Sequence, residues 1–233
     1  MNPHTTAFFS DDFVGGSLMD AAPSFTPNIP YIYTYGSMNS SLPTFNIADV
    51  SGHPGSYSLN TGSGTTNFST LHLRTLEILA SGVVTVEAVF KLSALSLITL
   101  EYRTKVGLIP NLSSVYSGAP DFTDTDSTGV YFMYDRLVRG SNWWTVTSTA
   151  NGFEEYQDTG IPVSAAWVKL KLVCDSVGSS VKFYANDAQV TEHTTRIPTT
   201  GFVACTTKKS AGLGGVSVNL DYWSRQIDFY TGR

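Results

Sequence analysis

The stretch from residue 167 to residue 190 carries a clear alternation of hydrophobic and polar positions. The residues on the hydrophobic side of its first half are Val168, Leu170, Leu172 and Cys174. A period of two is typical of a β-strand with one buried face. A polar break at residues 175–180 precedes a second alternating segment at 181–185, and a turn at Asn186-Asp187 precedes a short third one. We therefore predict a three-stranded antiparallel meander.

The same pattern predicts strands along most of the chain. They cover residues 8–13, 56–60, 70–79, 83–92, 95–105, 129–135, 143–147, 153–159, 201–205 and 217–223. Asn151-Gly152 lies between two of them and is a strong signal for a hairpin turn. No repeat, heptad or capped helical pattern interrupts the series. The sequence predicts an all-β protein, an antiparallel two-sheet sandwich with few or no helices, as a single domain over residues 1–233.

Residues 21–50 break the regular spacing, because four prolines fall within them. Proline lacks a backbone donor, so we expect irregular extended structure here rather than long strands. Tyr31, Tyr33 and Tyr35 would place three rings on one side of an extended segment. Aromatic side chains are enriched in protein interfaces. This Pro- and Tyr-rich extension is therefore a candidate interface segment, and its three rings suit a ligand as well as a protein interface.

Composition narrows the classes of partner. Charged residues are only 14% of the chain, the formal net charge is -5, and the basic residues are scattered, so we expect no nucleic-acid partner. No apolar run approaches the length of a membrane span, and no signal-peptide pattern opens the sequence. We expect a soluble protein made in a cytosol and not inserted into a membrane. In that setting Cys174 and Cys205 are expected to be reduced.

Several segments together suggest a family. They are Ser10-Asp11-Asp12-Phe13, Gly129-Val130-Tyr131-Phe132, Asn142-Trp143-Trp144-Thr145-Val146-Thr147, Val181-Lys182-Phe183-Tyr184-Ala185-Asn186-Asp187 and Val218-Asn219-Leu220-Asp221-Tyr222. The chain resembles, over nearly its whole length, the concanavalin A-like (laminin-G-like) jelly roll of tailed-bacteriophage virion proteins. The resemblance implies that the first and last strands lie near each other, with residues 12–13 close to residues 221–222.

The family also contains enzymes that cleave glycans, so the carboxylates matter. The Glu-x-Asp-x-x-Glu motif of its glucanases is absent here, and the nearest pair that shares a strand face is Glu154 and Asp158. Glu101-Tyr102-Arg103 is similar to a fragment of alginate-lyase strands, but the partner motifs are missing. We therefore predict no enzymatic activity, and a polysaccharide hydrolase or lyase ranks third among the possible functions.

Aromatic residues on neighbouring predicted strands could stack on sugar rings. The candidates are Trp143, Trp144, Tyr131 and Tyr134. Because Trp143 and Trp144 are consecutive, they must point to opposite faces of a strand. We predict that at least one of them lies in the core and that the other is a candidate sugar contact. The alternative is that these aromatic residues serve the core and a subunit interface.

Two further sets of residues carry side chains that can bind metal ions. Asp121, Asp124 and Asp126 concentrate oxygen donors in one loop, which makes calcium the possible cofactor. The four histidines are isolated in sequence, so we predict no zinc site and expect solvated or turn positions for them. They are His4, His53, His72 and His193.

These observations leave three functions open. The resemblance implies a non-enzymatic virion protein, a capsid decoration or tail-associated protein that is assembled in the host cytoplasm. It would dock on other virion proteins, form a homo-oligomer and bind host-surface glycans. The alternative is a carbohydrate-binding module or adhesin, with calcium as its possible cofactor. The hydrolase or lyase is the third.

Overall fold

The computed structural model describes residues 6–11, 33–36, 48–50, 53–64, 68–97, 99–109, 128–149, 153–177 and 179–230. In chain order the elements are β1 (Thr6–Asp11), β2 (Tyr33–Gly36), β3 (Ala48–Val50), β4 (His53–Asn60), β5 (Phe68–Ile78), the 3-10 turn η1 (Leu79–Ser81), β6 (Gly82–Leu92), β7 (Glu101–Ile109), β8 (Gly129–Asp135), the single helical turn α2 (Arg136–Arg139), β9 (Asn142–Thr149), β10 (Phe153–Pro162), β11 (Val168–Asp175), β12 (Ser180–Ala185), β13 (Ala188–His193), β14 (Thr200–Ala211) and β15 (Ser217–Phe229). The predicted all-β composition is confirmed.

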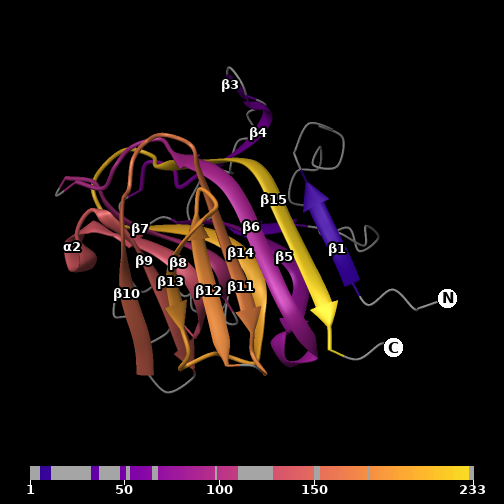
Figure 1. The fold of residues 1–233 in the computed structure, drawn as a ribbon. Coiled ribbons are helices and arrows are strands. Elements are labelled where there is room, and N and C mark those ends of the chain that lie inside the picture. The colour runs from indigo at the N-terminus through magenta and orange to yellow at the C-terminus, as the bar shows by residue number, and fades with distance from the viewer. Residues whose placement is uncertain are drawn as a thin grey trace.

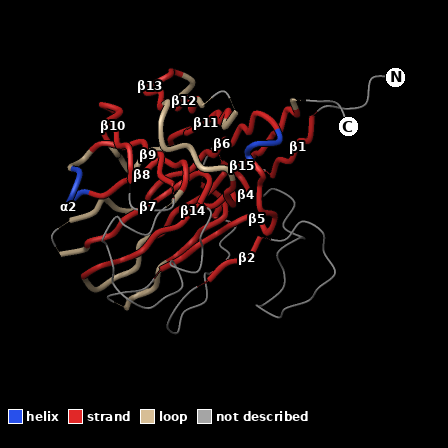
Figure 2. Tube along the Cα trace, turned by 90° about the horizontal axis from the view of Figure 1, so that it is seen from below, coloured by secondary structure: helices blue, strands red, loops and turns tan. Residues whose placement is uncertain are grey.

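The strands form two antiparallel sheets that lie in two layers (Figures 1 and 2). Sheet A has the order β13-β12-β11-β6-β15-β4-β3, and β1 also pairs with β15. Sheet B has the order β10-β9-β8-β7-β14-β5-β2. Because neighbours in a sheet are often far apart in sequence, the chain crosses repeatedly from one layer to the other, and the two-sheet sandwich predicted from the sequence is confirmed.

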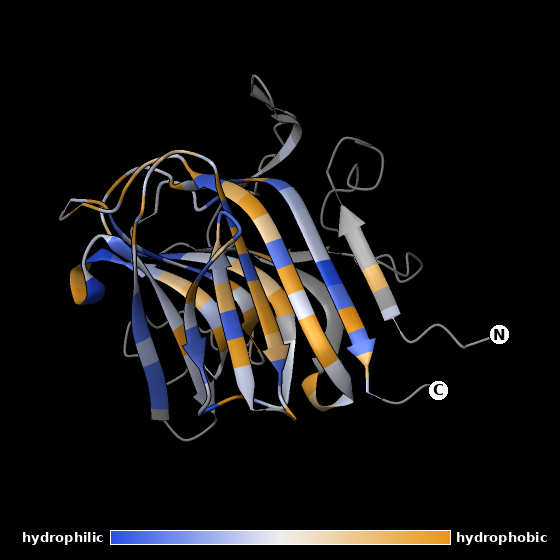
Figure 3. Cartoon of the chain, viewed as in Figure 1, coloured by the Kyte–Doolittle hydropathy of each residue, from blue (hydrophilic) through white to orange (hydrophobic). Residues whose placement is uncertain are grey.

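The core between the sheets is made by the inward residues of each strand. Along β6 every second residue is buried, from Gly82 through Val84 to Leu92, and Figure 3 shows stripes of apolar and polar residues along the strands. Phe90 and Trp143 meet edge to face across the layers at 5.6 Å, and so do Phe132 and Phe183 at 5.2 Å. Such aromatic pairs add to the free energy gained by burying apolar surface.

Cys174 of β11 and Cys205 of β14 lie in this core as free, fully buried thiols. Burial disfavours the thiolate and raises the pKa of each to about 12. Both side chains therefore act as small apolar groups, which agrees with the expected reduced state.

The predicted meander is strands β11, β12 and β13. Leu170 of β11 pairs with Ala185 of β12, and Val181 of β12 pairs with His193 of β13. The turn between β12 and β13 places Asn186 and Asp187 at φ angles of 48° and 69°. Positive φ at both central residues is the two-residue hairpin geometry that Asn and Asp tolerate best, so the short polar pair determines the register.

The first and last strands are neighbours, as the family resemblance implied. Thr6 pairs with Asp228, and Asp11 pairs with Trp223, along the full length of β1. Figure 1 shows β1 and β15 side by side at one edge of the view. Residues 12–13 lie outside the described residues, so their expected position beside residues 221–222 stays a prediction.

The middle of sheet B is buried on both faces, and every residue of β8 is buried. Its inward residues join the main core. Its outward residues belong to a second, smaller cluster of Ile109, Tyr131, Met133, Val146 and Ala204, with Tyr156 packed beside it. A strand buried on both sides needs a nearly continuous apolar sequence, which explains the composition of residues 129–135.

The strand predicted at residues 95–105 is displaced in the structure. β7 begins only at Glu101, and Leu95 and Leu97 lie in an exposed loop closed by a bridge between Leu97 and Leu100. The predicted strand ended at residue 105, but β7 continues through Gly107 to Ile109. Hydrophobic leucines in a loop imitate a strand in sequence, so periodicity alone misplaced the boundary.

Two short segments within residues 21–50 are strands, β2 and β3. Tyr33 pairs with Leu73 and Tyr35 pairs with Leu71, whereas Tyr31 lies outside the described residues. The role of the three tyrosines at an interface, and the single-domain boundary, stay predictions.

Gly107 provides a direct test of the sheet B geometry. A Cβ at this position would lie 2.3 Å from the carbonyl oxygen of Val130 and 2.7 Å from the Cα of Tyr131. We expect Gly107→Ala to lower the free energy of unfolding by about 3 kcal/mol or more, because the neighbouring backbone must move. Gly140→Ala is the control: its φ is 80° but nothing lies within 4 Å, so only about 1 kcal/mol of backbone strain is expected. Urea unfolding of both variants measures the difference, and equal losses would contradict the described pairing of β7 with β8.

Candidate functional site

Strands β9 and β10 form a hairpin at the edge of sheet B that presents different chemistry on its two faces. Trp144 pairs with Asp158, Val146 with Tyr156, and Thr147 with Glu155. Because side chains alternate along a strand, one set of residues points away from the sandwich and the next set points into it. The outer set is aromatic and charged, and the inner set is a network of hydroxyl groups around a histidine.

On the outer face Trp144 is half-buried and is held by the helical turn α2. Its indole Nε1 donates a hydrogen bond to the carbonyl oxygen of Arg139 at 2.8 Å. The guanidinium carbon of Arg139 lies 5.3 Å from the Trp144 ring centre and 3.6 Å from that of Tyr156. The guanidinium of Arg139 therefore stacks on the Tyr156 ring and borders the Trp144 ring. Both contacts are attractive, because the face of an aromatic ring carries partial negative charge.

A carboxylate and an amide lie beside this aromatic pair. Asp158 is exposed, and its carboxylate accepts from Asn142 Nδ2 at 3.0 and 3.1 Å and from the backbone N–H of Gly160 at 2.8 Å. These bonds fix the carboxylate next to the strand position of Trp144. We call Trp144, Arg139, Tyr156, Asn142 and Asp158 the Trp144 cluster.

The helical turn that holds Trp144 is itself fixed by a buried ion pair. Asp135 accepts from Arg103 Nε at 2.7 Å, and both side chains are largely buried. The other carboxylate oxygen of Asp135 accepts from the backbone N–H of Val138 at 3.3 Å, which caps α2. The segment joins the strands predicted at residues 129–135 and 143–147, and the cap explains why it forms a helical turn.

The four aromatic residues predicted to contact sugar have different positions. Trp143 and Trp144 point to opposite faces, as predicted, and it is Trp143 that lies in the core. Tyr131 and Tyr134 are 0% and 1% exposed. A ring without an exposed face cannot stack on a sugar, so of the four candidate sugar contacts only Trp144 has an accessible ring. Arg139 and Tyr156, which complete its surroundings, were not singled out from the sequence.

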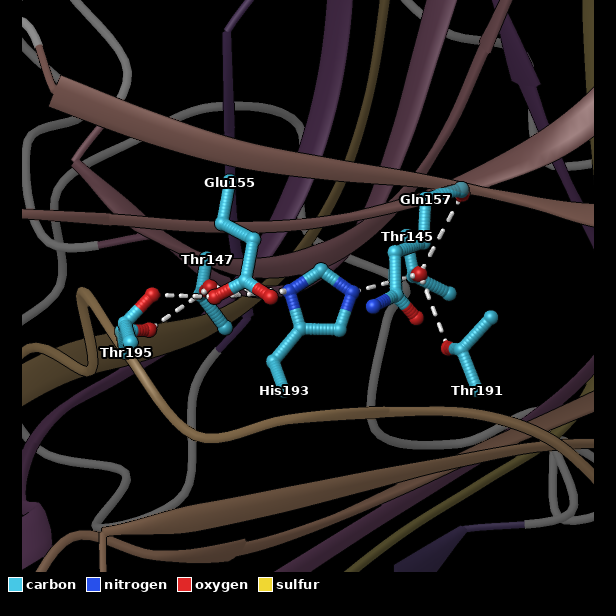
Figure 4. Close-up of polar contacts among 7 residues, drawn as sticks. All are labelled: Thr145, Thr147, Glu155, Gln157, Thr191, His193 and Thr195. Atoms are coloured by element: carbon cyan, nitrogen blue, oxygen red, sulfur yellow. Dashed lines mark hydrogen bonds and ion pairs between the residues drawn. The ribbon is translucent and has the colours of Figure 1, made fainter.

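On the inner face of the hairpin His193 of β13 is fully buried among threonines (Figure 4). Its Nε2 lies 2.8 Å from Thr145 Oγ1, and its Nδ1 lies 2.9 Å from Thr147 Oγ1. Glu155 Oε2 lies 3.9 Å from Nδ1 and accepts a hydrogen bond from the Thr195 hydroxyl. These contacts join the edge strand of sheet A to the edge hairpin of sheet B. We call them the His193 network.

The hydrogen bonds of the network determine which nitrogen carries the proton. Thr147 donates its only hydroxyl hydrogen to the carbonyl oxygen of Thr195 at 3.0 Å, so Nδ1 must donate to Thr147. Thr145 Oγ1 lies 2.8 Å from Nε2 and 3.3 Å from the carbonyl oxygen of Gln157, and the shorter contact favours Nε2 as the acceptor of its hydrogen. The Thr145 oxygen then accepts from Thr191 at 2.8 Å. The geometry therefore indicates a neutral histidine protonated at Nδ1. Burial lowers its pKa, and the charge of Glu155 opposes that shift only in part.

The expectation of solvated histidines is wrong for His193. Its partners come from β9, 46 and 48 residues earlier in the chain, and so the isolated sequence position hid a crowded site. His53 begins β4, His72 lies within β5, and His4 lies outside the described residues.

The sequence-predicted carboxylates do not form a catalytic pair. Glu154 and Asp158 share the outer face of β10, but four residues of strand separate them by about 13 Å, beyond the spacing that glycosidases use. Glu101 accepts from Ser210 Oγ at 3.1 Å, and Arg103 is paired with Asp135. Tyr102 is buried with its hydroxyl bonded to the carbonyl of Ala94, and burial raises its pKa well above the usual range.

In the part of the chain that the structure describes, no group of three or more His, Cys, Asp or Glu side chains is placed to hold a metal ion. Asp121, Asp124 and Asp126 lie outside that part, so calcium binding in their loop stays a prediction. None of the described helices has the length and apolar character needed to cross a membrane.

Comparison with solved structures identifies the fold. Peanut lectin, solved with a nine-residue peptide, superposes with a TM-score of 0.60 at 12% identity over 97% of this chain and 99% of its own. The carbohydrate recognition domain of Emp47p gives 0.56 at 13% identity over 94% and 95%. A protein of unknown function from Shewanella oneidensis MR-1 gives 0.57 at 13% identity over 98% and 89%. No family model and no curated protein matches the sequence. The concanavalin A-like jelly roll implied by the sequence is confirmed.

The His193 network gives a pH dependence with a definite sign. Since the folded-state pKa of His193 lies below its unfolded value of about 6.5, the unfolded chain binds a proton that the folded protein does not as the pH falls below that value. We expect the free energy of unfolding to fall by up to about 1.4 kcal/mol per pH unit there from this residue. His193→Gln should lower stability at neutral pH and flatten this slope, measured by urea unfolding between about pH 7 and pH 5.

Nitrogen-15 NMR provides an independent check. At neutral pH the ring of His193 should show the Nδ1-protonated neutral form, and its signals should titrate below those of a histidine in a denatured chain. An Nε2-protonated ring, or a titration midpoint at or above about 6.5, would show that the network is not the one described.

Proposed function

We propose that this protein is a non-catalytic carbohydrate-binding protein, and that it binds sugar at the Trp144 cluster. The observation that carries the proposal is the half-buried Trp144 ring on the outer face of sheet B, next to the fixed carboxylate of Asp158 and the amide of Asn142. The fold, shared with peanut lectin and with a domain named for carbohydrate recognition, supports this assignment.

The chemistry of the cluster suits a sugar ring. A pyranose has an apolar face, which packs on an aromatic ring, and hydroxyl groups at its rim, which need donors and acceptors. Trp144 supplies the ring, Asp158 supplies acceptor oxygens, and Asn142 supplies an amide that already contacts that carboxylate. Because Arg139 and Gly160 hold these groups before a ligand arrives, little conformational entropy is lost on binding.

The site lacks features that catalysis would require. Hydrolysis of a glycosidic bond needs two carboxyl groups within roughly 10 Å of each other across the substrate. Glu154 and Asp158 are farther apart along their strand, and the described residues of Glu101-Tyr102-Arg103 are engaged in other bonds. These geometries support a binding role over a hydrolase or lyase.

The virion context is a second proposal, which rests on the family resemblance of the sequence. In that setting the sugar would be a host-surface glycan, and the protein would dock on other virion proteins as a homo-oligomer in the capsid or tail. Recovery of the chain in fixed stoichiometry from purified particles would support this proposal. Its absence from particles would leave the sugar-binding proposal intact, because that proposal depends on the Trp144 cluster alone.

The sugar-binding proposal predicts the effect of removing one ring. Trp144→Ala should weaken binding to the ligand found on a glycan array by about tenfold or more, because a stacked ring at the centre of a site contributes 1.4 kcal/mol or more. Trp167→Ala is the matched control. It removes a half-buried tryptophan, with Lys91 over its ring at 5.1 Å, that directly precedes β11 of sheet A. Calorimetric titration of the soluble oligosaccharide measures both.

Asp158→Asn separates the polar contribution from the aromatic one. It keeps the shape of the side chain and one acceptor oxygen, so folding should be preserved while sugar binding weakens. Equal affinity in the wild type, Trp144→Ala and Asp158→Asn would place the sugar elsewhere. Loss of binding in Trp167→Ala alone would move the site to sheet A.

Loss of binding on adding a chelator would support the calcium prediction for Asp121, Asp124 and Asp126.

A further inference from the structure

Lys209 is a charged residue inside the sandwich. It lies near the end of β14, pairs with Tyr102 of β7, and is 0% exposed. The alternation of β14 places it on the same face as Val203, Cys205 and Thr207, which point toward sheet A. The strands predicted at residues 201–205 and 217–223 left Lys209 between them, so its burial within a strand was not predicted.

The ammonium group of Lys209 is surrounded by backbone carbonyl oxygens from two loops. It donates to the carbonyl of Gly64 at 2.7 Å, to that of Gly62 at 3.4 Å and to that of Gly214. An ammonium has three hydrogens, and three acceptors satisfy it completely. One loop follows β4 and the other joins β14 to β15, so the side chain connects the two sheets at this end.

Glycine allows the carbonyl groups to converge on one point. Gly62 and Gly214 have φ angles of 71° and 106°, which other residues rarely adopt. The loops are also bonded to each other, because Thr61 N–H donates to Val216 O at 2.9 Å and Asn60 Nδ2 donates to Ser217 Oγ at 2.8 Å. Bonds between the two loops therefore help to hold these three carbonyl groups in place, in addition to their bonds to Lys209. We call the carbonyl groups of Gly62, Gly64 and Gly214 the carbonyl cage.

No carboxylate balances this charge among the described residues, where Lys209 forms no ion pair. Burying a charge without a counter-ion costs free energy unless polar groups of the protein replace its water shell. Burial therefore lowers the pKa of Lys209. Converging backbone carbonyls are also the ligands with which proteins replace the water shell of a potassium ion. The ammonium of Lys209 is therefore surrounded by the same kind of ligand, backbone carbonyl oxygens, that binds a monovalent cation such as potassium.

We propose that the carbonyl oxygens of Gly62, Gly64 and Gly214 form a monovalent-cation site that is filled in this protein by the ammonium of Lys209. The side chain acts as a covalently attached cation. It fixes the loops at residues 61–64 and 212–215 without an external metal. The site takes potassium or a small alkylammonium ion when the side chain is shortened.

The test compares Lys209→Ala with Lys209→Met. Both remove the ammonium, but alanine opens space for an ion, whereas methionine keeps the stem that fills it. In buffer without potassium we expect both to lower the midpoint of thermal unfolding, by about 5–10 °C. Added potassium or methylammonium chloride should restore at least half of the loss in Lys209→Ala, with saturation, because a ligand that binds only the folded state stabilises it. Lys209→Met and the wild type should respond no more than to choline chloride.

Two results would overturn the proposal. One is a response of Lys209→Ala to potassium that equals its response to choline chloride. The other is saturable stabilisation of the wild type by potassium, which would mean that the cage is not already filled. Lys182→Ala, which removes a half-buried lysine on the outer face of β12, controls for the general loss of a charge.

NMR of the wild type tests the site even if the alanine variant does not fold. The Nζ hydrogens of Lys209 should exchange with water many times more slowly than those of Lys182, because all three are bonded inside the protein. Through-bond coupling from Nζ to the carbonyl carbons of Gly62, Gly64 or Gly214 would identify the acceptors. Exchange as fast as that of Lys182 would overturn the proposal.

Discussion

The period of two along β9 and β10 is the constraint on which both faces of the hairpin depend. The same two strands carry Trp144 and Asp158 outward and Thr145, Thr147 and Glu155 inward. A shift of register by one residue would exchange the two sets and bury charges in the core. The His193 network anchors the inner face to sheet A, and that anchor holds the backbone on which the Trp144 cluster is displayed.

Buried polar groups lie at one edge of the sandwich and at one end of it. His193 bridges the sheets between β13 and the hairpin, and Lys209 bridges them at the glycine loops. Each is satisfied by short-range hydrogen bonds, so each contributes directionality that apolar packing lacks. Phe132, Phe183 and their neighbours supply the apolar stabilisation of the core, and the polar bridges add hydrogen bonds between the two layers.

Local patterns were sufficient to predict most of the fold. The alternation around Leu170 and the Asn186-Asp187 turn predicted strands β11 to β13, and the adjacency of Trp143 and Trp144 predicted their opposite faces. Sites formed by side chains were harder to predict from the sequence, because the residues that form them come from distant strands. His193 appears isolated in sequence and meets Thr147 only once the two sheets pack, and Lys209 looked like a loop residue for the same reason.

The position of β15 also has a consequence for how the protein is made. β15 lies between β6 and β4 in the interior of sheet A, and it is the last strand described. Until residues 217–229 have left the ribosome, β6 has an open edge and β1 has no partner, although β1 was synthesised more than 200 residues earlier. Contacts of such sequence separation form slowly, so the nascent chain exposes unpaired strand edges for much of its synthesis. During translation this sheet therefore stays open until β15 pairs with β6 and β4.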